Sequence, residues 1–153
     1  MIKIRKLEPG DEDKIKDFIN GIMTDEFSVE NSAYAYEDLN NVMEHYGGDR
    51  ELFLVAEEED GKVIGTLAIK EDGPDTALLR RVLVDKKYRG KGYGGMLLKQ
   101  AMDFCFDHNY KNVSFRGTDR MQTALRLCLK NGFEEQDVAE FGDFKLMTLS
   151  RKL

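Results

Sequence analysis

The sequence has 153 residues, 41% of them hydrophobic, which suffices for one domain with a substantial core. Its 23 Lys and Arg residues against 29 Asp and Glu residues give a net charge of −6, which argues against broad binding to nucleic acid or to an anionic membrane. No apolar run has the length of a membrane-spanning helix and residues 1–6 do not resemble a signal peptide, so a cytoplasmic protein is predicted.

A strand and two helices are predicted for the N-terminal third. Residues 2–7 alternate in polarity and end at Pro9-Gly10, which is typical of a strand followed by a turn. The first helix follows an acidic turn, and its apolar side chains recur at helical spacing. These are Ile15, Phe18, Ile19 and Ile22. A second helix is predicted over residues 36–46, where Gly47 stops it.

The segment between these helices, residues 24–35, is rich in acidic and polar residues. We expect it to line a substrate entrance, with Glu26, Tyr34 and Tyr36 as candidate substrate-binding residues. A carboxylate favours a cationic amine, and aromatic rings hold apolar or cationic groups. An ordinary solvated connection is an equally good interpretation.

Three strands are predicted to follow in an antiparallel meander. Residues 52–56 and 63–69 flank Asp60-Gly61, a strong hairpin signal. A turn at residues 72–75 then leads into a strand that ends at Val84.

A glycine-rich turn joins this strand to a helix. Residues 82–84 suit a buried strand, four glycines fall within residues 90–95, and apolar residues recur at helical spacing from Met96 onward. Glycines let backbone amides approach a ligand closely, and the helix N-terminus favours anions. Six cations between residues 80 and 91, against the single acid Asp85, favour an anion as well. The turn is therefore a predicted phosphate site, with a solvated basic loop as the alternative.

Two other phosphate motifs fit these residues less well. Gly90-x-Gly92-x-x-Gly95 has the spacing of a dinucleotide fingerprint, but it does not follow its strand directly, and the later strand offers Phe115 and Arg116 instead of an acid. A P-loop needs Ser or Thr where this chain has Gly92.

The C-terminal third is predicted to form a short strand, a helix and a hairpin. Residues 113–115 follow a helix, so they are expected to lie parallel to the preceding strand through a right-handed crossover. Asp119 and Gln122 have the spacing of a capping box for the last helix, and Gly132 ends it. The hairpin strands are predicted at residues 133–138 and 144–149.

The two cysteines and two histidines predict neither a disulfide nor a metal site. Cys105 and Cys128 fall in separate helical patterns, so two reduced thiols are expected. His45 and His108 are isolated from other ligand-type residues.

Arg89-x-x-Gly92-x-Gly94 after an apolar strand resembles the signature of the GNAT superfamily of acyl-CoA-dependent N-acyltransferases. Lys130-x-Gly132-Phe133 at the close of the last helix is a second family landmark. The resemblance extends over the whole order of elements. It implies a single GNAT-like N-acetyltransferase domain over residues 1–153, with an α/β (α+β) fold. One mixed, mostly antiparallel sheet of six to seven strands would be flanked by about four helices.

The resemblance also implies acetyl-CoA as co-substrate. The strand before the turn would pair with the pantetheine arm, and the turn would hold the pyrophosphate. The implied cofactor-binding residues are Val82, Leu83, Val84, Arg89, Gly90, Lys91, Gly92, Tyr93, Gly94 and Gly95.

Two departures from the family pattern concern the catalytic groups. Cys128 stands where many members have a general-acid Tyr, and Met121 where they often have an Asn; no carboxylate occupies the strand positions where a general base is common. Cys128 is the candidate catalytic residue, although its place on an apolar helix face is more typical of a buried core cysteine.

The leading hypothesis is an N-acetyltransferase in which a primary amine of a small molecule or peptide attacks the thioester directly. The main alternative is a non-catalytic acyl-CoA-binding or sensing module. An NADP-binding oxidoreductase is a remote third. Neither nucleic acid nor membrane is an expected partner, and a homodimer is left open.

Overall fold

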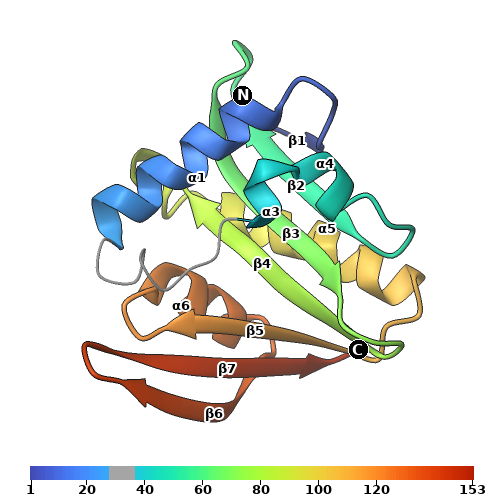
Figure 1. The fold of residues 1–153 in the computed structure, drawn as a ribbon, viewed down its shortest axis with the longest axis vertical. Coiled ribbons are helices and arrows are strands. Elements are labelled where there is room, and N and C mark those ends of the chain that lie inside the picture. The colour runs from blue at the N-terminus through green and yellow to red at the C-terminus, as the bar shows by residue number, and fades with distance from the viewer. Residues whose placement is uncertain (28–36) are drawn as a thin grey trace.

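A seven-stranded sheet runs through the protein, and helices cover both of its faces (Figure 1). The computed structural model describes residues 1–27 and 37–153. The strands are β1 (Lys3–Lys6), β2 (Leu52–Glu57), β3 (Val63–Glu71), β4 (Thr76–Val84), β5 (Asn112–Thr118), β6 (Glu134–Phe141) and β7 (Phe144–Lys152). The helices are α1 (Glu12–Glu26), α3 (Glu37–Asn40), α4 (Val42–His45), the 3₁₀ turn η1 (Lys86–Tyr88), α5 (Tyr93–Asp107) and α6 (Gln122–Lys130).

The strand order is β1-β2-β3-β4-β5-β7-β6. Every neighbouring pair is antiparallel except β4 and β5, which are parallel. The meander, the crossover through α5 and the closing hairpin are therefore confirmed. A mixed, mostly antiparallel sheet of seven strands agrees with the fold class that the resemblance implied.

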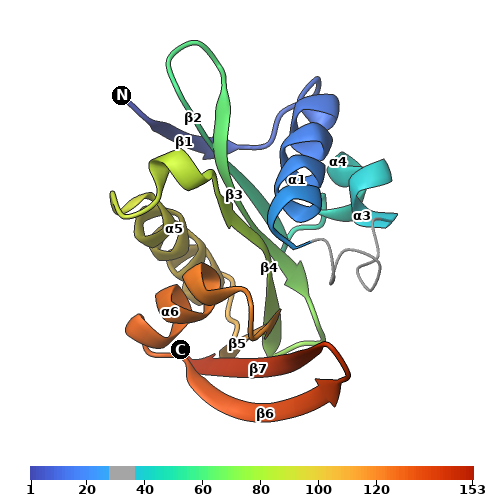
Figure 2. The ribbon, with the colours of Figure 1, turned by 90° about the vertical axis from the view of Figure 1, so that its left-hand side faces the viewer.

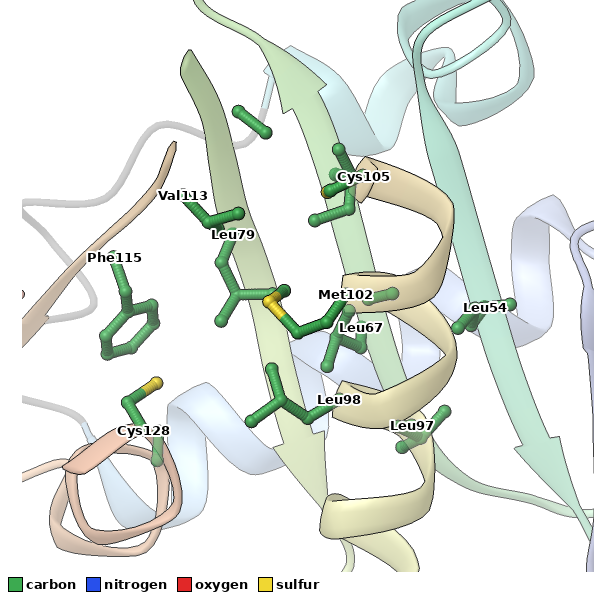
Figure 3. Close-up of a cluster of buried hydrophobic side chains, with 14 of the residues drawn as sticks. Leu54, Leu67, Leu79, Leu97, Leu98, Met102, Cys105, Val113, Phe115 and Cys128 are labelled. Carbon is green, nitrogen blue, oxygen red and sulfur yellow. The ribbon is translucent and has the colours of Figure 1, made fainter. Parts of the chain in front are cut away.

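Two hydrophobic cores lie on opposite faces of the sheet. Figure 2 shows α5 and α6 on one face and α1, α3 and α4 on the other. Leu97, Leu98 and Cys105 of α5 pack with Leu67 and Leu79 of the sheet in the first core (Figure 3). Ile15 and Ile19 of α1 pack with Val42, Phe53 and Val55 in the second core. Because β2 and β3 are covered on both faces, they are buried at nearly every position.

Two local predictions need correction. The single helix predicted over residues 36–46 is two short helices, α3 and α4, because Asn41 lies between them with φ −150° and ψ 62°. The capping box does not form: Met121 is the N-cap of α6, and the Asp119 side chain instead accepts a hydrogen bond from the Lys145 backbone N–H in β7 (3.1 Å).

None of the helices in residues 1–27 and 37–153 combines the length and the apolar character needed to cross a membrane.

Candidate active site

The two halves of the sheet separate where β4 and β5 end. Their pairing begins at Thr76↔Asn112 and stops at Leu79↔Phe115, although β4 continues to Val84 and β5 to Thr118. In Figure 1 the two strands diverge beyond this point. The β4 edge that faces β5 is therefore open beyond Leu79, which is where an amide-bearing ligand can add hydrogen bonds as an extra strand would.

A β-bulge in β4 sits at this opening. The β3–β4 register passes from Thr66↔Leu83 to Ala68↔Arg80, so two residues of β4 stand opposite one residue of β3. Arg81 has a φ of +54° there, and its carbonyl accepts a buried hydrogen bond from Thr66 Oγ1 (2.7 Å). The bulge turns this part of β4 away from a regular ladder.

A buried network fixes the bulge from the α1 side. The Arg81 guanidinium donates to both carboxylate oxygens of Asp38 (2.9 and 2.6 Å), and the Tyr46 hydroxyl donates to Asp38 as well (2.7 Å). Burial alone would raise the pKa of Asp38, but the hydrogen bonds and charge of Arg81 outweigh it and lower that pKa. The sequence analysis missed this network. An acid that shares a helical stripe with Val42 and Tyr46 was the signal for it.

Two adjoining cavities open at the parting of the strands. The larger, of about 430 Å³, lies over the β4, β5 and β7 face. Its lining consists of three arginines, two hydroxyl residues and apolar side chains; the polar members are Arg80, Arg81, Arg116, Ser114 and Thr118. The smaller, of about 180 Å³, is lined by the end of β4, by Arg89 and by the first turn of α6. Val82, Leu83 and Met121 line both cavities, so the two meet at the end of β4.

The glycine loop presents unpaired amides beside the smaller cavity. Gly90 has a φ of +77°, and Gly92, the N-cap of α5, a φ of +89°. The backbone N–H groups of residues 90–95 donate no hydrogen bond to the described part of the chain, and the first α5 bond runs from Met96 N–H to Gly92 (3.1 Å). A Cβ at Gly94 would lie 3.3 Å from Leu127 Cδ2, because α5 and α6 approach closely here. The arrangement suits an anion such as a pyrophosphate.

Arg89 and Glu26, predicted for different roles, form an ion pair with each other. The Arg89 guanidinium donates to both Glu26 oxygens (2.7 and 2.9 Å) and to the Val84 carbonyl (2.8 Å). The pair ties the end of α1 to the start of the glycine loop. Much of the charge of each residue is therefore balanced by the other, which weakens Glu26 as an attractor of a cationic amine.

Other predicted residues occupy different positions. Val82, Leu83 and Val84 line the smaller cavity, and their pairing with a pantetheine arm stays a prediction. Arg80 and Arg81 line the larger cavity, although they were expected to strengthen the positive field at the glycine loop. Lys91 extends from the loop with its Nζ 5.6 Å from the Tyr88 ring centre. Tyr34 and Tyr36 lie outside the described residues.

Cys128 lies in the core and not in either cavity. It is fully buried between α6 and the sheet, where it points toward Phe115 (Figure 3). Burial raises its pKa to about 12, as it does for the other free thiol, Cys105. The placement favours the interpretation of Cys128 as a core residue, and its general-acid role stays a prediction.

Comparison with known proteins agrees with this geometry. The model of the acetyltransferase (GNAT) family matches residues 16–133. A Staphylococcus aureus Mu50 acetyltransferase of the GNAT family has the same fold, with a TM-score of 0.86, 22% identity and coverage of 100% of this chain and 99% of that one. An Elizabethkingia anophelis GNAT acetyltransferase with acetyl-CoA bound has a TM-score of 0.68, 18% identity and coverage of 99% and 98%.

Sequence relatives match over a shorter stretch. An uncharacterized N-acetyltransferase of Schizosaccharomyces pombe is 28% identical over 99 residues, 64% of this chain and 61% of that protein. Human N-acetylaspartate synthetase is 33% identical over 92 residues, 60% of this chain and 30% of that protein. The chain thus matches less than two thirds of the length of these relatives. Since the family match covers most of the chain and the fold agrees with it, the protein belongs to the acetyltransferase (GNAT) family.

Proposed function

We propose that this GNAT family member is an N-acetyltransferase that transfers acetyl from acetyl-CoA to a primary amine of a small molecule or peptide. One observation carries the proposal: unpaired amides of the glycine loop lie beside the open edge of β4, and a cavity for a second molecule begins at the same strand end. Family membership supports the same activity.

The residues present fit the coenzyme. Amides of residues 90–95 and the N-terminus of α5 would hold the pyrophosphate, and the open β4 edge at residues 82–84 would bind the pantetheine amides. When bound, the coenzyme supplies a thioester carbonyl that an amine can attack. The acceptor would occupy the larger cavity and meet that carbonyl near Val82 and Leu83, which both cavities share.

Positioning is the main contribution that these residues make to the reaction. The amine nitrogen forms a bond to the acetyl carbon, the carbon–sulfur bond breaks, and the thiolate leaves with the electron pair. Orientation of two reactants supplies roughly 7–11 kcal/mol, whereas one general acid or base contributes about 10²- to 10⁴-fold. Among the described residues the only carboxylate that lines either cavity is Glu26, which is paired with Arg89. An amine substrate with a pKa of about 10.4 must therefore lose its proton to water or to a group outside the described residues.

Two measurements test the proposal. Calorimetric titration with acetyl-CoA should show binding, and release of free CoA thiol should accelerate when a suitable amine is added. Aspartate belongs in the amine panel because N-acetylaspartate synthetases are among the relatives. Absence of acetyl-CoA binding would contradict the proposal at its first step.

A non-catalytic acyl-CoA-binding module is the second candidate function. The burial of Cys128, and the absence of an unpaired carboxylate from the described lining of both cavities, favour it. Tight acetyl-CoA binding without thiol release across the panel would support this module, and turnover with any amine would exclude it. The cytoplasmic location, the single domain and the homodimer stay predictions.

A further inference from the structure

Two arginines from neighbouring strands, Arg80 of β4 and Arg116 of β5, line the larger cavity. Arg80 and Arg116 each directly follow the last paired residues of β4 and β5, Leu79 and Phe115. Leu79 and Phe115 both face the α5 core, so the next residues of the two strands both face the opposite side, over which the cavity lies. Adjacent strands lie about 4.8 Å apart where they pair, so the two arginines begin close together before the strands diverge.

The charges of this pair are not balanced within the described part of the chain. There, Arg80 and Arg116 make no ion pair and no side-chain hydrogen bond, and no carboxylate lines the larger cavity. The charge of Arg80 helps to lower the pKa of Asp38, so the two residues interact electrostatically. Asp38, however, already accepts three hydrogen bonds from Arg81 and Tyr46. Like charges at neighbouring strand positions destabilise a sheet. Arg80 is half-buried and Arg116 is exposed, and both line the larger cavity. Two unbalanced guanidinium groups in one cavity lining therefore indicate an anionic ligand.

We propose that the acceptor is an amine that also carries a carboxylate, held by Arg80 and Arg116. This inference rests on the proposed function. The planar guanidinium fork matches a carboxylate with two parallel hydrogen bonds. Apart from Ser114 and Thr118, the other walls of the cavity are apolar and suit an aliphatic or aromatic side chain; Leu78, Phe141 and Leu146 are among them. The ligand of this description is an amino acid.

The positions of the two ends are consistent with the reaction. Val82 and Leu83, where the cavities meet, lie two and three residues beyond Arg80 on β4. A regular strand would span roughly 7–10 Å here, and the bulge at Arg81 shortens that distance. An arginine side chain and a bound amino acid together span this length. A carboxylate anchored at Arg80 and Arg116 would thus direct the amine toward the thioester. The acceptor suggested by the acidic segment around Glu26 was a simple cationic amine, whereas the arginines favour one that also carries a carboxylate.

The test compares acids with their amides in matched variants. Acetylation of leucine and phenylalanine should exceed that of leucinamide and phenylalaninamide by at least tenfold in kcat/KM. Arg80→Gln and Arg116→Gln should each lower kcat/KM for the acids by about 10- to 100-fold and leave the amides nearly unchanged, and Arg116→Lys should recover part of the loss. Arg126→Gln, which removes an equal charge from an exposed position on α6 outside both cavities, should change neither.

Binding gives a readout that does not depend on turnover. In calorimetry with CoA present, N-acetylleucine should bind more tightly than N-acetylleucinamide, and Arg116→Gln should abolish the difference. Failure of CoA to bind would contradict the proposed function. In that case the affinities of N-acetylleucine and N-acetylleucinamide, measured without CoA, would still test the role of the arginines. Equal binding of acid and amide, or equal losses for both in the Gln variants, would overturn the inference. Preference for the aminoalkylphosphonate analogue of leucine over leucine would overturn the carboxylate assignment.

Discussion

Arg81 has a strained backbone conformation next to the larger cavity. Its φ of +54° is unusual for a residue with a side chain, and the surrounding contacts must maintain it. Asp38 and Tyr46 provide those contacts on one side, and Thr66 binds the carbonyl on the other. The cluster is buried, so each member depends on the others remaining charged or hydrogen-bonded.

Asp38→Asn should therefore destabilise the fold strongly. The substitution leaves the buried Arg81 without its counter-charge, for which we expect a loss of about 3–5 kcal/mol in the free energy of unfolding. Urea denaturation measures the change. Glu37→Gln, an exposed change one residue away, should stay within about 0.5 kcal/mol of the original protein. Similar losses for both variants would contradict the role given to the pair.

Cys128→Ala separates a core cysteine from a general acid. We expect a loss of roughly 1 kcal/mol of stability from the missing buried atom, and turnover that changes by no more than a few-fold. Cys105→Ala is the matched control, because its thiol is equally buried and also has a pKa raised to about 12. If turnover instead fell by about 100-fold or more for Cys128→Ala alone, the general-acid assignment would be restored.

At the scale of elements, the glycine loop and the β2–β3 hairpin each contain a glycine with the same positive φ. Gly92 and Gly61 both have a φ of +89°, and an added Cβ at either would meet nothing within 4 Å. Only Gly92 lies among the unpaired amides at the start of α5. The hairpin glycine closes a turn, and the loop glycine also shapes a predicted ligand site.

Gly92→Ala and Gly61→Ala should thus differ in function but not in stability. Each places a side chain in the left-handed region and should cost about 1–2 kcal/mol in the free energy of unfolding. Only Gly92→Ala should weaken acetyl-CoA binding, by at least about tenfold, or roughly 1.4 kcal/mol. Calorimetric affinities together with thermal unfolding check both statements. Unchanged affinity for Gly92→Ala would exclude the loop as the pyrophosphate site.

At the scale of the whole molecule, the sheet consists of two parts joined over four residue pairs of β4 and β5. The parallel junction lets the strands part and leaves room for ligands between α1, α6 and the hairpin of β6 and β7. Ion pairs brace the outer elements. Arg5 binds both Asp11 and Glu57, which connects β1, β2 and the start of α1.

These ion pairs predict a loss of stability in acid. Arg5 lowers the pKa values of Asp11 and Glu57, and at Asp38 and Glu51 the neighbouring cations outweigh the opposite effect of burial. Since the folded state holds these carboxyl groups ionised below their ordinary pKa values of 3.8 and 4.5, their contribution is present above about pH 5 and is lost as the pH falls. Burial lowers the pKa of His45 from its ordinary value of 6.5. Protonation of His45 therefore also destabilises the folded state, and this loss begins as the pH falls below about 6.5. Urea unfolding between pH 7 and pH 3 measures this; a free energy of unfolding that stays constant over that range would contradict it.

The sequence alone determined the order of elements and the position of the glycine loop, because both depend on local signals. Turn glycines, Asp60-Gly61 and the apolar periodicities act over a few residues, and the Arg89-x-x-Gly92-x-Gly94 signature lies in one continuous stretch. Only the tertiary structure decided which distant residues come together: Arg89 with Glu26, Arg81 with Asp38, and Arg80 with Arg116 in the lining of the larger cavity. The residues of each pair lie at least 36 positions apart in the sequence, and Arg80 and Arg116 have the smallest separation. Their approach depends on strand register and on the β4 bulge, which no local pattern specifies. For this reason two of the cations that the sequence assigned to a phosphate, Arg80 and Arg81, line the larger cavity instead.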